Sequence, residues 1–485
     1  MARGDGALRL IAACVATALL GACSMAPAYH PPETAAPVAF KEVPPGWMNA
    51  TPMDMAARGQ WWTMFGDPVL DDLEARAERA SPSLAAALAR YDQARASAQA
   101  AGADLYPQIG VSGSVSRERV SANRPLSLGS AAEYDNYRAG GAASYELDLW
   151  GRIRNRVKAG KAEADASEAD LGGARLSLQA LVADAYFRLR GLDAEAGLLR
   201  QTVEAFGRAY DLTATRHEGG IASGMDVNRA HTVLADARAQ ISAIAADRAA
   251  TEHEIATLLG EVASSFAIAP TTAAMTPPAP AGETPSELLQ RRPDIAAAER
   301  RMFAANARIG VARAAFFPTI GLGASGGFQT THGDLLTQPN HFWALGPLSA
   351  ALAIFDGGRR SAAVKMSRAQ YDEAAADYRD TVLTAFRQVE DALADNRYLA
   401  AQAIDQQEAA DAADRTSDLA LTRYRDGASD YLEVVTAQTA ALSAQRSVIA
   451  LQTQRMRASI ALVRAMGGGY ERPDGRRDAV PAGQP

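Results

Sequence analysis

Apolar side chains recur at alternating steps of three and four residues along two stretches of the chain. The first seam comprises Val227, Ala230, Leu234, Ala237, Ile241 and Ile244, and the second comprises Val434, Ala437, Ala441, Ala444, Val448 and Leu451. Each position of the second seam follows its counterpart by 207 residues (434 − 227 = 207). This heptad-like spacing predicts helices that pack as coiled coils, with an ordinary amphipathic core helix as the alternative. The shared register favours the coiled coil and indicates two copies of one structural unit.

Each seam belongs to a hairpin of unusually long helices. Of 23 prolines, none lies in 127–269 or in 349–471, and both stretches are rich in Ala, Leu, Gln, Glu and Arg, which favour helix. We expect one long helix over 152–218 and its copy over about 359–426, followed by breaks at Gly219-Gly220 and at Gly427. A further helix is expected over about 69–105, capped by Asp67 and bent at Pro82.

Four segments alternate between apolar and polar residues and predict strands. They lie at 108–116, 137–149, 318–329 and 342–355, and the fourth, which is apolar on both faces, is the weakest of the four. Alternation suits a half-exposed soluble sheet or a membrane barrel with lipid outside and water inside. Four strands cannot close a barrel, and open sheet edges in lipid are costly. Strands in a membrane would therefore require several chains, and three chains would supply twelve strands.

The N-terminus has the pattern of an export signal. Residues 10–20 are apolar but too few to span a bilayer. The following Leu-Gly-Ala-Cys, ending at Cys23, resembles a bacterial lipobox, with a chance cysteine near an ordinary cleavage site as the alternative. We therefore predict a signal peptide over 1–22 and lipidation of Cys23 by diacylglycerol and N-palmitate. Residues 23–60, rich in Pro and Ala, are predicted to form an extended tether.

Composition argues against several functional classes. The net charge of −7 does not favour nucleic-acid binding, which needs a basic face. The only other cysteine is Cys14, and the six histidines form no metal-binding doublet. The sequence holds no nucleophile triad, phosphate loop or paired catalytic carboxylates, so we expect no enzyme, no metal and no cofactor beyond the lipid.

Several motifs, taken in order, resemble those of the TolC/OprM-like outer-membrane factors. They are Tyr-Glu-Leu-Asp-Leu-Trp-Gly-Arg at 145–152, Arg-Arg-Pro-Asp-Ile at 291–295, Phe-Phe-Pro at 316–318, Phe-Asp-Gly-Gly-Arg-Arg at 355–360, and Arg-Ala-Met-Gly-Gly-Gly-Tyr at 464–470. The resemblance covers about 61–470. Together with the lipobox, these motifs make the chain similar to the NodT-type lipoprotein branch, which serves RND tripartite efflux systems.

The resemblance implies a mainly α fold with a membrane β-barrel. Long α-helical hairpins would form a periplasmic α-barrel, and four strands per chain would enter a shared twelve-stranded barrel of a homotrimer in the outer membrane. The expected division is a first structural repeat at 61–262, a linker at 263–285, a second repeat at 286–470 and a flexible tail at 471–485. The implied function is a passive conduit for small toxic compounds, working with a periplasmic adaptor and an inner-membrane RND pump.

Two other functions stay open at this point. The outer channel of a type I protein secretion system shares the fold, and the gene beside it would encode an ABC exporter instead of an RND pump. A periplasmic adaptor or coiled-coil scaffold has no pore, but adaptors usually carry one hairpin, whereas this chain has two matched hairpins.

The resemblance also assigns roles to the two glycine turns, which should lie at the periplasmic tip. The expected gate comprises Tyr424, Arg425, Asp426, Asp430, Tyr431, Leu432 and Glu433. The expected adaptor contacts are Arg216, Gly220, Ala222, Ser223, Arg423, Gly427, Ala428 and Ser429. Threefold symmetry would turn one carboxylate into a ring of negative potential, and an apolar ring beside it could gate by dewetting. Thr436 departs from the family pattern, which has Asp, and the acids could instead be solvated helix-capping charges.

Overall fold

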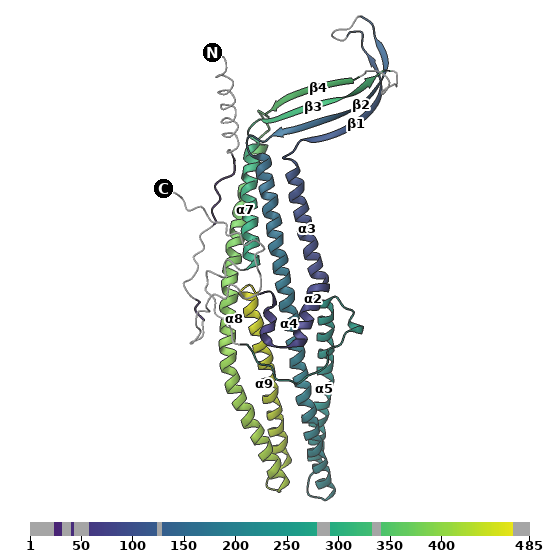
Figure 1. Ribbon diagram of the computed structural model, residues 1–485. Coiled ribbons are helices and arrows are strands. Elements are labelled where there is room, and N and C mark those ends of the chain that lie inside the picture. Colours follow the sequence, from purple (N-terminus) through teal and green to yellow (C-terminus); the bar gives the residue numbers. More distant parts are fainter. Residues whose placement is uncertain are drawn as a thin grey trace. The chain divides into compact units, whose positions relative to one another are not determined.

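The computed structural model describes residues 24–31, 40–42, 58–123, 129–278, 292–331 and 341–468. Its chain divides into two compact units, which we describe separately. The sheet unit comprises Met1–Pro32, Tyr91–Glu168 and Ala297–Tyr378, and the hairpin unit comprises Glu33–Arg90, Ala169–Ala296 and Arg379–Pro485. The elements (Figure 1) are η1 Arg58–Phe65, α2 Pro68–Ala80, α3 Pro82–Ala103, β1 Gln108–Val120, β2 Ala132–Leu147, α4 Arg152–Glu218, α5 Gly224–Leu259, η2 Ala263–Ser265, α7 Pro293–Ala314, β3 Thr319–Thr330, β4 His341–Ala351, α8 Arg359–Arg425 and α9 Tyr431–Ala465.

The sheet unit contains one antiparallel sheet with the strand order β1-β2-β3-β4. Its register brings Val111 opposite Gly141, and Gly141 opposite Gly326. Since residues directly opposite one another project from the same face, the register assigns each side chain to one of two faces.

The two faces differ in chemistry. One face carries Ile109, Val111, Val115, Tyr137, Ala139, Ala143, Tyr145, Leu147, Ile320, Leu322, Ala324, Phe328, Trp343, Leu345 and Leu348. The other face carries Gln108, Ser112, Ser114, Ser116, Glu118, Asn136, Arg138, Ser144, Glu146, Ser325 and Gln329. Eight of these fifteen apolar side chains are exposed, with Val111 at 90% and Leu345 at 88%, and the other seven are half-buried. A sheet with this division needs an apolar solvent on one side and water on the other.

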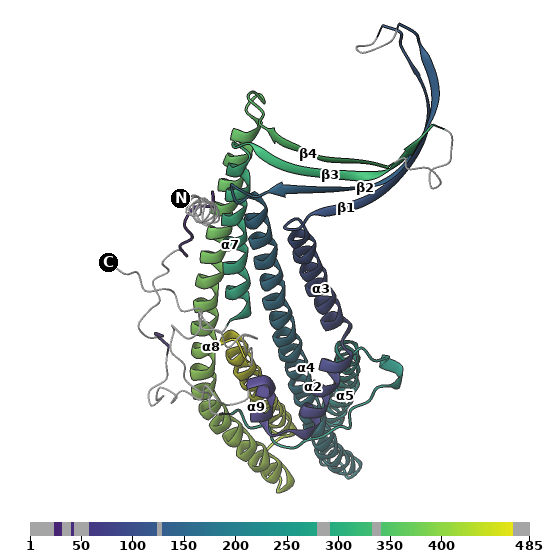
Figure 2. The same ribbon diagram turned by 45° about the horizontal axis from the view of Figure 1, so that its top comes forward.

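The sheet curves strongly along its length (Figure 2). Gly140 of β2 lies opposite Gly327 of β3, on the polar face. A Cβ at Gly140 would lie 2.7 Å from the carbonyl oxygen of Gly326, and a Cβ at Gly327 would overlap the backbone of Ala139. Only glycine fits this close approach of the two strands.

Among the described residues, the strand predictions are confirmed in number and order, but their ends differ. Strand β1 continues to Val120 instead of ending at Ser116, and β2 begins at Ala132 instead of Tyr137. Strand β3 is displaced by one residue, to Thr319–Thr330. The fourth strand ends at Ala351, not Phe355, because its partner β3 begins at Thr319, opposite Ala351, and offers no residue to pair further. The second strand ends at Leu147, not Leu149, because the side chain of Asp148 turns to cap α4.

The hairpin unit contains α2, α5 and α9, together with residues 169–218 of α4 and 379–425 of α8. Helix α4 spans the predicted residues, and α8 ends one residue earlier than predicted. The expected helix over 69–105 is two helices, because the chain becomes extended at Ser81, before Pro82. The helical conformation is unfavourable for the residue that precedes a proline. The chain therefore interrupts the helix at Ser81 instead of bending it.

The core of the hairpin unit joins α2, α4, α5 and the segment after α5. Fully buried members include Leu70, Tyr186, Leu189, Ile255 and Leu259. The predicted seams are also covered, since Ala230, Leu234 and Val434 are buried and the remaining seam positions are at least half-buried. Among the helices of the described residues, none combines the length and hydropathy that crossing a bilayer requires.

The two hairpins are joined along α4 and α9 within the hairpin unit. The guanidinium group of Arg446 lies 2.5 Å from the Glu195 carboxylate, and that of Arg457 lies 2.6 Å from Asp184. Between these ion pairs the helices approach closely at Gly191, where a Cβ would overlap the side chain of Thr453. These two ion pairs and the close approach at Gly191 hold α4 against α9.

Candidate functional site

The first glycine turn joins α4 to α5. Gly220 has φ 74°, a conformation that glycine adopts without strain. The amide of Ile221 donates to the carbonyl oxygen of Arg216 over 2.8 Å. Ser223 then caps α5, and its hydroxyl and amide both bond to the Asp226 side chain while the Asp226 amide donates to the Ser223 hydroxyl. This reciprocal capping box fixes where α5 begins.

The second glycine turn joins α8 to α9 by the same plan. Gly427 has φ 76°, and the amide of Ala428 donates to the carbonyl oxygen of Arg423 over 2.8 Å. Asp430 caps α9 by accepting a hydrogen bond from the Glu433 amide at 3.2 Å. Asp430 is therefore a helix-capping residue, as the alternative interpretation of the acidic residues predicts.

Two aromatic rings fill the second turn. Tyr424, near the end of α8, and Tyr431, the first residue of α9, meet edge to face with their centroids 5.2 Å apart. Both side chains are buried, and they pack with Ala209, Ala230 and Val434. Burial raises the pKa of Tyr431 to about 12, and the neighbouring Tyr424 adds to this shift.

The first hairpin reaches across to this aromatic pair. Arg216 of α4 donates a hydrogen bond to the carbonyl oxygen of Tyr424, and its guanidinium carbon lies 4.7 Å from the centre of the Tyr424 ring. Thr213, one turn earlier on α4, lies 3.4 Å from the Tyr424 hydroxyl. We call Arg216, Thr213, Tyr424 and Tyr431 the tip latch, because they join the two hairpins near their turns.

The other residues assigned to the tip from the sequence lie outside this latch. Those with exposed side chains or backbones are Gly220, Ser223, Arg423, Arg425, Asp426, Gly427, Ala428, Asp430, Leu432 and Glu433, whereas Ala222 and Ser429 are half-buried. Exposed apolar side chains occur on both turns, with Ile221 72% and Leu432 46% exposed. Cys23 lies outside the described residues.

Sequence reasoning placed Arg216 only on an outer contact surface and overlooked Thr213. The repeat contains a signal that could have found the latch. At the spacing of 207 residues, Tyr424 matches His217 and Tyr431 matches Gly224. The second copy thus has two large aromatic residues where the first has a histidine and a glycine, which marks the second turn as the one with a filled interior.

Two of the family motifs, at 145–152 and 355–360, lie at the strand–helix junctions of the sheet unit. The Asp148 carboxylate accepts from the amides of Ile153 and Arg154, so it caps α4. Asp356 similarly accepts from the amides of Gly358 and Arg360, and hydrogen bonds from Arg360 lower the pKa of Asp356. These aspartates and arginines build the junctions.

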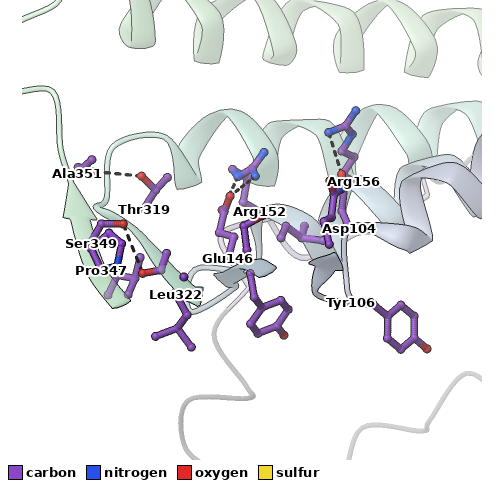
Figure 3. A pocket seen from close by; sticks show the side chains of 17 residues that line it. Asp104, Tyr106, Glu146, Arg152, Arg156, Thr319, Leu322, Pro347, Ser349 and Ala351 are labelled. Atoms are coloured by element: carbon purple, nitrogen blue, oxygen red, sulfur yellow. Dashed lines mark hydrogen bonds and ion pairs between the residues drawn. The ribbon is translucent and has the colours of Figure 1, made fainter. Parts of the chain in front are cut away.

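A pocket lies beside the first junction (Figure 3). Its charged residues form ion pairs with one another: Arg152 with Glu146 at 2.6 Å, and Arg156 with Asp104 at 3.1 Å. Strand residues such as Leu322 and Ser349 complete its lining. Within the described residues, no three His, Cys, Asp or Glu side chains are arranged to hold a metal ion.

Comparison with known proteins identifies the family of this chain. The sequence matches the family described as outer membrane efflux protein over residues 74–261 and 284–468. The chain belongs to the outer membrane efflux protein family. The two matched segments contain the two helical hairpins and the four strands.

Relatives of this outer membrane efflux protein match it along almost its whole length. It is 35% identical to the pyoverdine export outer membrane protein OpmQ of Pseudomonas aeruginosa, over 96% of this chain and 97% of that protein. It is likewise 35% identical to the outer membrane protein OprJ of the same species, over 93% and 94%. The solved outer-membrane channel OprN superimposes with a TM-score of 0.85 at 30% identity, over 92% of this chain and 99% of OprN. The predicted fold class, outer-membrane location and efflux function are thereby confirmed.

Proposed function

We propose that three copies of this chain form one outer-membrane efflux conduit. The observation that carries this proposal is the sheet, which has an uncovered apolar face, a polar face and, among the described strands, open edges at β1 and β4. Unpaired strand edges in lipid cost several kcal/mol per group. Pairing β4 of each chain with β1 of the next would close a twelve-stranded barrel, with lipid outside and a polar lumen inside.

The tip latch is proposed to hold the periplasmic entrance closed. Opening would separate the two hairpins of each chain, which breaks the hydrogen bond from Arg216 and uncovers the ring of Tyr424. Exposed residues around the latch, including Asp426, Leu432 and Glu433, would line the aperture. A charged and apolar constriction of this kind is suited to gating by repulsion and dewetting.

The remaining partners follow from the same proposal. The exposed turns around Gly220 and Gly427 would receive the tip of a periplasmic adaptor, and an inner-membrane RND pump would supply the substrate. Residues 1–22 would be removed as a signal peptide, and Cys23 would carry diacylglycerol and N-palmitate. The chain itself would act as a passive conduit, without chemistry or a cofactor.

Channel recordings on the purified protein in planar bilayers test the conduit and the latch together. A hydrogen bond to a charged donor contributes about 1.5–3 kcal/mol, so Arg216→Ala should favour opening by roughly ten- to a hundredfold for each chain, and by more in a trimer that loses all three contacts. The matched control is Arg423→Ala. Its guanidinium group bonds only to the Ala428 carbonyl of its own turn among the hydrogen bonds of the described residues, at 3.4 Å, so conductance should stay near that of the parent.

Two results would contradict this proposal. Equal conductance of the Arg216→Ala and Arg423→Ala proteins would refute the latch. Silence of an assembled trimer that carries both Arg216→Ala and Tyr424→Ala would refute the conduit, because that protein lacks the contacts that we propose to close it.

A further inference from the structure

Another pocket lies in the hairpin unit, where α9 runs between α4 and α8 (Figure 1). Helix α9 contacts α4 through the ion pair of Arg446 with Glu195. It contacts α8 through Gln445, whose side-chain nitrogen donates to both carboxylate oxygens of Asp414 over 2.7 Å. The pocket between the three helices has a volume of about 340 Å³, a size that suits a small organic molecule. It shares no residue with the tip latch or with the pocket of Figure 3.

The polar part of the lining carries negative charge without a counter-charge. Asp414 and Asp418 lie one turn apart on α8, and neither forms an ion pair within the described residues. None of the residues that line the pocket is basic. Two groups that could donate are already used, since Gln445 donates to Asp414 and the hydroxyl of Thr202 donates to a carbonyl oxygen of its own helix over 3.0 Å. The lining therefore favours a ligand that is positively charged and donates hydrogen bonds.

A buried amide in the same lining lacks a hydrogen-bond partner. Gln438 of α9 is 7% exposed, and its Oε1 atom accepts no hydrogen bond among the described residues. A buried oxygen without a donor costs free energy, which a donor placed in the pocket would recover. This observation does not depend on the two carboxylates, and it also points to a ligand that donates hydrogen bonds.

Apolar side chains form much of the remaining lining. Phe206 of α4 and Leu442 of α9 are buried in the core that joins α4, α5 and α9, and Leu198 lines the pocket beside them. Such a surface suits methylene groups, which gain free energy when they leave water. A bare metal ion would gain nothing from it, and within the described residues no three His, Cys, Asp or Glu side chains are arranged to hold one. The ligand chemistry is therefore that of an organic cation.

The first hairpin does not repeat this combination of residues. At the spacing of 207 residues, the counterparts of Asp414, Asp418, Gln438 and Gln445 are Gly207, Asp211, His231 and Arg238. The first copy thus keeps one of the two acids and has an arginine among the counterparts. The acidic pocket is a property of the second copy alone.

We propose that this pocket binds an aliphatic diammonium compound, with one ammonium group at Asp414 and the other at Asp418. Side chains at positions i and i+4 of a helix share a face, with their Cβ atoms about 5–6 Å apart. A butyl chain separates two ammonium groups by a similar distance. Each ammonium group has several N–H donors, so one group can serve a carboxylate and the Gln438 oxygen together. The site goes beyond the proposed conduit and latch, because it lies within one chain and uses none of the latch residues.

Equilibrium dialysis of the full-length protein in detergent against radiolabelled putrescine, the diamine with a butyl chain, tests the site at low ionic strength. We expect saturable binding that weakens about tenfold in Asp418→Asn, because a charge-assisted hydrogen bond is lost. The matched control is Asp211→Asn, which removes the same charge at the equivalent position of the first hairpin. Both aspartates are exposed, so both variants should fold, and the Asp211→Asn protein should bind putrescine as the parent does.

A second variant separates ligand binding from stability. Gln438→Met keeps the length of the side chain and removes the unpartnered oxygen, so the protein without ligand should melt at a higher temperature than the parent. Its affinity for putrescine should nevertheless fall about threefold or more, because the ligand loses an acceptor. Unchanged affinity in this variant would contradict the role of the amide.

Three results would overturn the site itself. The first is the absence of saturable putrescine binding to the parent, and the second is equal affinity of the parent and Asp418→Asn. The third is an equal loss of affinity in Asp418→Asn and Asp211→Asn, because the diffuse negative charge of the chain would then attract the diamine. Butane diol, which has the same chain without charge, should not displace putrescine, and displacement by this diol would refute the charge requirement.

Discussion

Glu74 of α2 is a carboxyl group buried without a partner, and its removal should stabilise the protein. The residue is 0% exposed in the core of the hairpin unit, and neither carboxyl oxygen has a hydrogen-bond partner among the described residues. Burial raises the pKa of Glu74 from 4.5 to about 9, and the negative charges of Glu78 and Asp71 act in the same direction. The folded protein therefore holds this proton at neutral pH, whereas the unfolded chain releases it.

This difference in proton binding sets the sign and size of the effect. Because the folded pKa is the higher one, the contribution of Glu74 is complete below about pH 4.5. It is then lost by about 1.4 kcal/mol per pH unit as the pH rises toward 9. At pH 7 the loss is about 3 kcal/mol, from 2.5 pH units above the unfolded value. Glu74→Gln keeps the shape and the polarity but does not titrate, so it should recover most of this free energy.

Thermal unfolding in detergent, followed at a fixed scan rate from pH 5 to pH 9, measures the effect. The Tm of the Glu74→Gln protein should be close to that of the parent at pH 5, and the gap should widen steadily with pH. Asp72→Asn on the same helix is the control, because Asp72 is exposed and pairs only with Arg76 among the ion pairs of the described residues. Such surface pairs contribute about 0.5 kcal/mol or less. A Tm gap for Glu74→Gln that stays constant across this range would refute the reasoning, because it would show that Glu74 does not titrate differently in the folded state.

Two further predictions concern the packing of the hairpin unit. Gly191→Ala should lower stability by about 1–3 kcal/mol through overlap with Thr453, and Thr453→Ala should restore most of the loss in melting experiments. Gly207→Ala on the same helix meets no atom within 4 Å and should be neutral or slightly stabilising. Asp193→Ala should cost roughly 3 kcal/mol, because the buried carboxylate binds Arg248 at 2.7 Å and the amide of Thr271. Limited proteolysis should then cleave near Thr271 faster, and an unchanged cleavage rate would contradict this role of Asp193.

Elements with a strong periodic signal could be predicted from the sequence. The long helices begin after Gly151 and Gly358 and end close to Gly220 and Gly427, and all four glycines have positive φ. The strand ends were harder to predict, because they depend on the partner strand. The pattern of 342–355 contains nothing to show that pairing stops at Ala351, which lies opposite the first residue of β3, Thr319.

Extended segments could not be predicted, because their contacts come from distant residues and have no period. The segment after α5 was expected only as a linker, yet Phe266 and Ile268 are buried and charged side chains bind its backbone. Arg248 donates to the carbonyl oxygen of Ile268 over 2.6 Å, and Arg190 donates to that of Ala273 over 2.9 Å. A sequence pattern cannot show that arginines on two long helices will bind the same extended segment.

The two copies of the structural unit also differ in the contacts that their equivalent arginines make near the turns. Arg216 and Arg423 occupy equivalent positions, yet Arg423 bonds to its own turn while Arg216 crosses to the other hairpin. The Arg216 guanidinium group also lies over the Tyr424 ring, a contact that the first turn lacks because His217 and Gly224 stand where the second has its two tyrosines. A symmetric pair of turns like the first would offer two arginines and no tyrosine ring. The ring contact between the two hairpins therefore depends on divergence of the copies, and in the proposed trimer its loss in all three chains should loosen the entrance.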